Sequence, residues 1–302
     1  AYKTILEEKP TYYNFAGYDS ATTTEEKTNP ASYTLIPTVP VDTMRFTVKV
    51  ESGNLGFCIP FPDSGNTPAT ITVSWGDGTP AVVVPKGTTL ATGDKFEYTY
   101  AEAGTYTITI GSGATADKQQ IPVLNFNQRG SSYNPNKLVS LETPLLNMNC
   151  SSLSKAFRIC ENLTTIPGNL FEKNTAATDF KNCFQSCSAL KAIPEGLFAK
   201  NAEATNFNSC FYGCTYMMFN PNIFVDPTAA EQDKLNRFID KDMDFRNCFY
   251  QVNLHNNSGT APALWKYEKG SGQWKTTNCF KGCIMSNSED ITDYSAWGTP
   301  KF

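Results

Sequence analysis

A repeat of 27 residues, best preserved between Ser152 and Cys214, constrains the fold of this chain more than any other feature of the sequence. Phe157, Phe184 and Phe211 recur at this spacing, and a cysteine follows each of them by three residues. One unit of this length cannot bury its own apolar side chains, whereas stacked copies share a continuous core. The fixed period therefore predicts a solenoid.

Within a copy, the apolar residues follow the spacing of a short helix. The clearest stripe, at positions i, i+3, i+4 and i+7, is Phe180, Cys183, Phe184 and Cys187. Asp179 precedes this stripe, and an aspartate there can accept a hydrogen bond from the N–H groups of a helix start. The segment 190–194, Leu-x-x-Ile-Pro, then predicts a short extended stretch that its proline ends.

The copies become irregular after Met217. Phe249 of the next copy follows Phe211 by 38 residues rather than 27, so an insertion lies at roughly 225–242. A final copy at 278–283 lacks the first phenylalanine of the stripe. Such weakening is expected of a terminal unit that faces water on one side.

Eight of the ten cysteines fall on or beside these stripes, at positions that alternate with phenylalanine. Cysteine packs as a small hydrophobic residue, so we expect reduced thiols in the core. A disulfide between Cys183 and Cys187, one helical turn apart, is a geometrically constrained alternative. Zinc binding by the cysteines is a second alternative. Structural zinc sites, however, favour cysteine pairs that converge from two segments rather than from one repeated face.

The composition argues against several classes of partner. The chain of 302 residues carries a formal net charge of -4, and no basic patch is visible along it, so nucleic acid and anionic membrane surfaces are poor partners. It contains no run of about 18 apolar residues, which predicts the absence of a transmembrane segment. Because it opens at Ala1 without methionine, we expect a processed or trimmed chain.

The first 41 residues are polar, with prolines in their later part, which is typical of a leader or tether. From Asp42 onward, apolar and polar residues alternate with period two, for example in 45–50 and 71–75. Further short strands are expected at 81–84, 96–100 and 106–110. Short strands separated by turns predict a β-sandwich.

Part of this region resembles the polycystic-kidney-disease (PKD) domain. The resemblance is carried by 73–79, with its Trp-Gly-Asp-Gly turn, by 96–100, and by 104–108. Many members have a histidine where this sequence has Tyr98. The resemblance covers about residues 42–112 and implies an immunoglobulin-like spacer domain, usually extracellular.

The repeats are similar to those of the BspA-like leucine-rich-repeat surface proteins of gut Bacteroidetes such as Bacteroides. The segments that carry this resemblance are 196–201, 205–207, 210–214, 260–265 and the closing 295–298. It covers about residues 138–298 and implies a surface-exposed lipoprotein or a secreted protein, of a kind associated with cell adhesion. A lipid-bearing cysteine would precede the chain, because Cys58 is too far from its start.

Together these features predict a mixed fold, in which an N-terminal all-β immunoglobulin-like (PKD-like) sandwich is followed by an α/β leucine-rich-repeat-like solenoid. We expect a leader or tether at 1–41 and the PKD-like β-sandwich at 42–125. The solenoid with its C-terminal cap is expected at 138–302, after a linker.

No catalytic constellation is visible in the sequence. His255, the one histidine, lies in a polar loop without a nucleophile motif, and we interpret it as a solvated residue. Asp77 could contribute to a calcium site, but a side-chain hydrogen bond that closes its turn is favoured. The segment 286–293 is a weaker calcium candidate, more simply a solvated acidic loop. We therefore expect no enzyme activity, no cofactor and no metal.

Aromatic residues are the better candidates for ligand binding. The ones singled out are Tyr212, Tyr216, Trp265 and Trp274. Core packing is the alternative, but aromatic side chains beside asparagine and threonine also bind sugars and proteins on repeat surfaces.

The function that we expect is that of a non-enzymatic binding or adhesion protein, whose repeat platform contacts an extracellular protein or glycan. Its expected location is the outward-facing surface of the outer membrane, or outside the cell after secretion. Two alternatives stay open: a carbohydrate-handling accessory protein or enzyme of the outer surface, and a structural spacer or assembly subunit.

Overall fold

The computed structural model describes residues 13–16, 34–37, 42–62, 64–90, 96–127, 135–255 and 259–301. Their strands are β1 (Tyr13–Ala16), β2 (Thr34–Pro37), β3 (Asp42–Val50), β4 (Gly56–Cys58), β5 (Ile71–Ser74), β6 (Val82–Val84), β7 (Glu97–Thr99), β8 (Gly104–Ser112), β9 (Leu138–Leu141), β10 (Met243–Asp244) and β11 (Trp274–Lys275). Their helices are the 3-10 turns η2 (Pro135–Lys137), η3 (Asn236–Phe238), η4 (Leu264–Lys266) and η5 (Ser288–Asp290), and the α-helices α3 (Glu231–Leu235) and α4 (Tyr294–Trp297).

Most of the predicted leader, 1–41, lies outside the described residues. Its described strands β1 and β2 pair antiparallel, with Tyr13 opposite Pro37.

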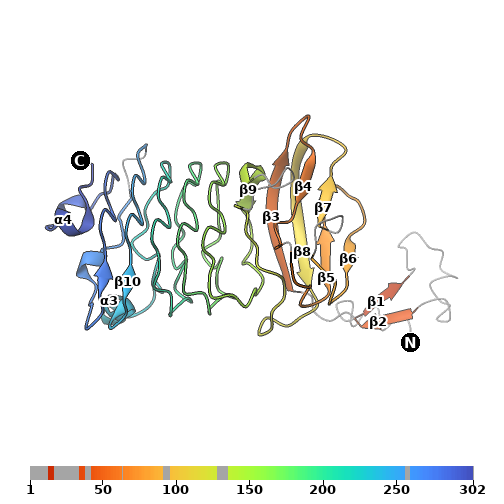
Figure 1. Cartoon of the computed structure of the whole chain (residues 1–302), viewed down its shortest axis with the longest axis horizontal. Helices are drawn as coiled ribbons and strands as arrows, with labels where there is room; N and C mark the ends of the chain where they lie inside the picture. The colour runs from red at the N-terminus through yellow and green to blue at the C-terminus, as the bar shows by residue number, and fades with distance from the viewer. Residues whose placement is uncertain are drawn as a thin grey trace.

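A five-stranded antiparallel sheet adjoins one end of the layered part of the molecule, in the order β6-β5-β8-β3-β9 (Figure 1). Its strands β3, β5, β6 and β8 overlap the predicted strands, and alternate side chains of β3 (Met44, Phe46, Val48 and Val50) point into the core. A two-stranded sheet of β4 and β7 accompanies it. The sheet content of this region fits an all-β domain.

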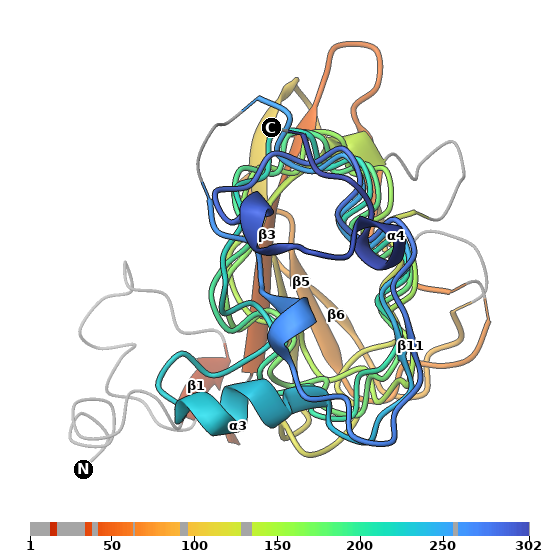
Figure 2. The same cartoon turned by 90° about the vertical axis from the view of Figure 1, so that its left-hand side faces the viewer.

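The rest of the described chain is a stack of turn-rich layers that extends from β9 to α4 (Figure 1). Viewed along the stack, successive layers superpose in outline, and α3 lies outside their common edge (Figure 2). The core is continuous between the two regions, since Phe126 packs against both Phe46 and Phe157, with ring centroids 5.5 Å apart in each case. The strand β9, at the start of the repeat region, is itself part of the five-stranded sheet.

The predicted fold class is wrong, because the chain does not form an α/β leucine-rich-repeat-like solenoid. Among the described residues, α3 and α4 are the only α-helices, and neither coincides with a predicted repeat helix. In the second copy, Asn182 and Ser186 have φ angles of 57° and 61°. A right-handed helix requires φ of about −63° at each residue, so the backbone leaves helical conformation twice within the predicted stripe.

Two consecutive turns produce the same apolar spacing as a helix. Cys183 N donates to Phe180 O at 3.1 Å, and Cys187 N donates to Phe184 O at 3.1 Å, so each turn closes on itself. The intervening N–H groups point to the next layer, as Phe184 N does to Cys210 O at 2.8 Å. A stripe at i, i+3, i+4 and i+7 therefore does not distinguish these turns from a helix.

The predicted capping residues do accept backbone hydrogen bonds, but they begin turns instead of helices. Asp179 Oδ1 accepts from Lys181 N at 3.0 Å, and Asn206 Oδ1 accepts from Asn208 N at 3.1 Å. The same residues pair with each other as isolated parallel bridges, and this one-residue ladder continues through Asp244 into β10 and β11.

Columns of stacked rings fill the interior. Phe157, Phe184, Phe211, Phe249 and Phe280 lie face to face in successive layers, with centroids 5.2 to 5.6 Å apart. All five are fully buried. Each ring contributes both burial and stacking with its neighbours, so the column stabilises the layers at this spacing.

The cysteines of the repeats pack beside these rings. All nine cysteines between 150 and 283 lie in the described ranges, and none of them is in a disulfide. The Sγ atoms of Cys187 and Cys214 donate to the carbonyls of Phe157 and Phe184, both at 3.1 Å. Burial raises the pKa of Cys214 to about 12, so this thiol stays protonated and unreactive at neutral pH.

An ion pair between Lys173 and Asp42 connects the repeats to β3. Lys173 Nζ contacts Asp42 Oδ1, and Gln120 Nε2 donates to Asp42 Oδ2 at 3.1 Å. Burial raises the pKa of Asp42, but the hydrogen bonds from Lys173 and Gln120 outweigh it, and the net effect lowers the pKa below its ordinary value. Within the described residues, no helix is long and apolar enough to cross a membrane.

Substitution Asp42→Asn should destabilise the protein in a pH-dependent way. A carboxyl whose pKa is lowered by folding stabilises the folded state above its unfolded pKa of about 4, and this contribution is lost as the pH falls through the folded value. The difference in unfolding free energy between wild type and variant should therefore be full at pH 7 and shrink below about pH 4. Urea titrations across this range measure it. A difference that does not change with pH, or the same profile for the exposed control Glu97→Gln, would contradict the assignment.

Gly213→Ala and Ser186→Gly test the turn geometry. Gly213 has φ of 72°, and a Cβ there would meet no atom closer than 3.7 Å, so conformation alone decides the effect. At a left-handed φ, alanine lowers the stability of the fold by about 1 kcal/mol relative to glycine. In a helix interior, alanine would instead raise it by about 1 kcal/mol. We expect Gly213→Ala to lower the free energy of unfolding in urea and Ser186→Gly to raise it. Changes of the opposite sign would indicate a helix at these positions and would contradict the turn geometry.

Candidate functional site

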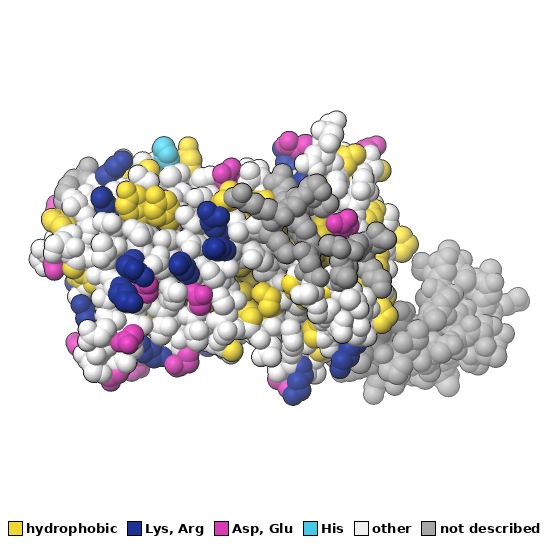
Figure 3. Space-filling view, in the orientation of Figure 1, with side chains coloured by type: hydrophobic (Ala, Val, Ile, Leu, Met, Phe, Trp, Pro, Cys, Tyr) yellow, Lys and Arg dark blue, Asp and Glu magenta, His cyan; other side chains and the backbone are white. Residues whose placement is uncertain are grey.

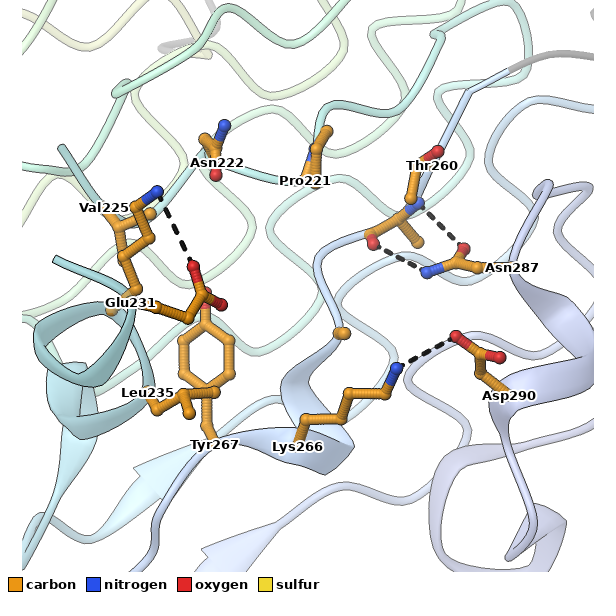
Figure 4. Close-up of a pocket in the computed structure, with 13 residues that line it drawn as sticks. Pro221, Asn222, Val225, Glu231, Leu235, Thr260, Lys266, Tyr267, Asn287 and Asp290 are labelled. Carbon is orange, nitrogen blue, oxygen red and sulfur yellow. Dashed lines mark hydrogen bonds and ion pairs between the residues drawn. The ribbon is translucent and has the colours of Figure 1, made fainter. Parts of the chain in front are cut away.

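A groove forms where two irregular parts of the repeat region meet. The insertion at 225–242 contains α3 and η3, and the segment before the last copy contains η4. These segments face each other across a hollow (Figure 4), and its volume is about 230 Å³. Its lining residues are Pro221, Asn222, Val225, Glu231, Lys234, Leu235, Thr260, Ala261, Ala263, Lys266, Tyr267, Asn287 and Asp290.

Arg237 anchors the insertion that forms one wall. Its guanidinium donates to the carbonyl oxygens of Phe224 and Ala202, both at 2.9 Å, of Asn201 at 2.7 Å, and of Phe198 at 3.3 Å. Within the described chain it forms no ion pair with a carboxylate, and burial lowers its pKa. Four carbonyl acceptors from two earlier layers therefore hold α3 in place.

The opposite wall is held by polar side chains. Asn287 bonds to both backbone groups of Ala261, accepting from its N–H and donating to its carbonyl at 3.0 Å each. Lys266 Nζ lies 3.2 Å from Asp290 Oδ2, and both side chains are about half exposed (Figure 4). These bonds connect the segment before the last copy to η5.

The floor of the groove is partly aromatic. The ring of Tyr267 stacks on that of Phe238, with centroids 5.8 Å apart, and burial raises the pKa of Tyr267 to about 12. Glu231 and Lys234 on α3 form an ion pair at 3.8 Å, in which the glutamate is exposed and the lysine is mostly covered. With two basic and two acidic side chains, the groove is electrically balanced.

A second hollow, of about 300 Å³, lies beside the groove. Its lining residues are Gly168, Asn169, Glu172, Glu195, Gly196, Leu197, Ala199 and Lys200. The two are neighbours, because Asn222 of the groove donates through Nδ2 to Glu195 Oε1 at 2.8 Å. The corners of three successive layers thus form one hollowed edge.

The four aromatic residues selected from the sequence are not brought together. Tyr212 stacks on Tyr250 with centroids 4.8 Å apart, and the half-exposed Tyr216 stacks on His255 at 4.3 Å. Trp265 and Trp274 lie near the groove but not in its lining, because both are partly buried against the core. None of the four lines the groove.

The other sequence candidates occupy structural positions. Asp77 Oδ1 accepts from the N–H and hydroxyl of Thr79, at 3.1 and 2.7 Å, and Oδ2 accepts from Tyr98 Oη. The hydrogen bond from Tyr98 and those from Thr79 lower the pKa of Asp77. The described ranges contain no group of three or more His, Cys, Asp or Glu side chains that could hold a metal ion.

The lining of the groove was not predicted, although the sequence contained one signal of it. The spacing of 38 residues between Phe211 and Phe249 marks the insertion. Which segment the insertion faces depends on tertiary packing, which no local pattern indicates.

Comparison with protein-family models, with curated proteins and with solved structures finds no match for this chain.

Arg237→Met should destabilise the wall of the groove by about 2–4 kcal/mol, because four carbonyls, three of them in part-buried hydrogen bonds, lose a charged donor. Hydrogen exchange should report faster exchange of amides in 226–242, with less change in the layers before 198. Lys241→Met is the matched control, since its ammonium also bonds to Ala202 O but is more exposed. Equal effects of the two substitutions would contradict the anchoring role.

Proposed function

We propose that this protein is a non-enzymatic binding or adhesion protein that contacts an extracellular protein or glycan through its repeat region. The groove between α3 and η4 is the proposed contact site. Its proposed location, at the cell surface or outside the cell, follows from the resemblance of the repeats to bacterial surface proteins.

The convergence of the irregular segments is the observation that carries the proposal. In repeat proteins, departures from the period map to one side, which is often the binding side. Here the insertion at 225–242, the segment around η4 and the segment before η5 all contribute to one groove. A hollow with an apolar floor and a few polar groups at its rim is the usual form of a ligand site.

The chemistry of the lining favours binding over reaction. Asn287 is committed to Ala261, and the carboxylate of Asp290 is paired with Lys266. Glu231 is paired with Lys234. Paired side chains of both signs suit a neutral, hydrogen-bonding ligand such as a sugar or a protein loop.

Ala263→Phe tests this proposal by placing a ring in the groove. The labelled wild-type protein, applied to arrays of proteins and uncharged glycans, should bind a subset of features, and the variant should lose at least roughly tenfold in signal on them, equivalent to about 1.4 kcal/mol. Ala116→Phe, at an exposed position in the sheet region, is the control and should bind as wild type. No feature above background, or full binding by Ala263→Phe, would contradict the proposal.

A further inference from the structure

A second surface of the repeats has a regular arrangement of side chains. The residue that follows each stacked phenylalanine lies on this surface in every layer. In order along the stack these residues, which we name the charged column, are Arg158, Gln185, Tyr212, Tyr250 and Lys281. None of them is fully buried, and none lines the groove.

The charged column lies on a basic face of an acidic chain. The five layer segments that form this face are 152–164, 179–191, 206–218, 244–255 and 275–287. Seven basic residues, Lys155, Arg158, Lys181, Lys191, Arg246, Lys275 and Lys281, stand here against three acidic ones, Glu161, Asp179 and Asp244. Figure 3 shows dark-blue side chains gathered over the stacked layers, around a yellow patch. The whole chain has a formal net charge of -4. This face therefore has the opposite sign to the chain as a whole, and it attracts anions.

Two of the three acidic residues of this face, Asp179 and Asp244, bond to neighbouring side chains. Asp244 forms a two-point pair with Arg246, at 2.6 and 2.9 Å. Asp179 Oδ2 accepts from the Ser152 hydroxyl at 2.9 Å. By contrast, neither Arg158 nor Lys281 forms an ion pair within the described part of the chain. The two ends of the charged column are therefore cations to which the described residues supply no counter-ion.

The middle of the charged column also favours anions. Tyr212 and Tyr250 stack almost parallel, at 6°, so their faces cover each other and leave the ring edges for other contacts, and neither side chain is fully buried. Aromatic ring edges carry partial positive charge, and the described residues offer no acceptor to either hydroxyl. Lys281 Nζ lies 6.0 Å from the Tyr250 centroid, on the same column. Arg158 Nε donates to Gln185 Oε1 at 2.8 Å, which aligns the first two members.

The spacing of the layers selects among linear anionic polymers. Adjacent members of the charged column are separated by one layer, and the centroids of stacked rings in successive layers lie 4.8 to 5.6 Å apart. An extended polypeptide advances by about 3.3 Å per residue, so its side chains fall out of register with the layers. An extended, equatorially linked polysaccharide advances by nearly one layer per sugar ring.

We propose that the charged column binds a linear acidic polysaccharide, with one sugar ring over each layer. Carboxylate or sulfate groups then contact Arg158 and Lys281, and sugar oxygens accept from the tyrosine hydroxyls. This contact is separate from the groove, and it names one class of ligand for the binding function proposed above.

Calorimetric titration with a β-(1→4)-linked mannuronate hexamer tests the inference. Wild type should bind it, and the affinity should fall with added salt because the contact is between opposite charges. The uncharged β-(1→4)-linked mannose hexamer, which differs at the carboxylates, should bind at least roughly tenfold more weakly. Equal binding of the two sugars would overturn the proposal.

Variants assign the binding to the charged column. Arg158→Gln with Lys281→Gln should weaken mannuronate binding by roughly tenfold, and Tyr212→Phe with Tyr250→Phe should weaken it while preserving the stacked rings. Lys86→Gln with Lys118→Gln removes the same charge from the sheet region and should have no effect. If the first pair perturbs folding, the exposed pair Lys155→Gln with Lys281→Gln replaces it. Unchanged binding by the column variants would contradict the assignment.

Two further measurements separate the outcomes. Hexaglutamate carries the same number of side-chain carboxylates as the mannuronate hexamer, but on a polypeptide. If hexaglutamate binds as tightly as the mannuronate hexamer, the choice of a polysaccharide is refuted. Ala263→Phe, which fills the groove, should leave mannuronate binding unchanged. Failure of the groove proposal and failure of this one are therefore distinguishable.

Discussion

The hydrogen bonding between layers is the constraint on which the repeat region depends. Alternate N–H groups of each layer close turns within the layer, and the others donate to the next layer, as Phe157 N does to Cys183 O and Phe211 N to Cys248 O. Because buried polar groups must be paired, this division leaves no freedom to shift one layer against another. The ring columns then stack at a spacing that the backbone already fixes.

This constraint also determines where binding surfaces can occur. Each regular layer places a side chain at the same position as the layer before it. Equivalent side chains therefore align into columns along the stack, such as the charged column from Arg158 to Lys281. A hollow requires a departure from regularity, and the insertion at 225–242 provides it with Arg237 as its anchor. The column suits an extended polymer, whereas the groove suits a compact group.

The interior of the repeats was predictable from the sequence, but its backbone was not. The 27-residue period correctly identified the buried positions, from Phe157 and Cys160 to Phe211 and Cys214. The predicted helices and the α/β solenoid were wrong, since two turns place apolar side chains at the same spacing. Gly213 and Gly282, at equivalent positions with positive φ, were the available sign of this conformation.

The surfaces were harder to predict than the core. A linear search for basic patches fails here, because the basic residues are separated by whole repeats and meet only after stacking. Trp265 and Trp274 pack partly against the core, since the last layers use them to cover Phe280 and Phe245. The segments that line the groove depend on contacts between residues far apart in sequence, such as Asn287 with Ala261.

The central claim is that the recurring cysteines and phenylalanines are the dry interior of the stack and have no reactive role. Counting thiols with a chromogenic disulfide reagent, without reductant, tests it most directly. In the native protein, reaction should be confined to the partly exposed Cys150, and all ten cysteines should react after unfolding in urea. Rapid reaction of several thiols in the native state, or fewer than ten after unfolding, would contradict the account.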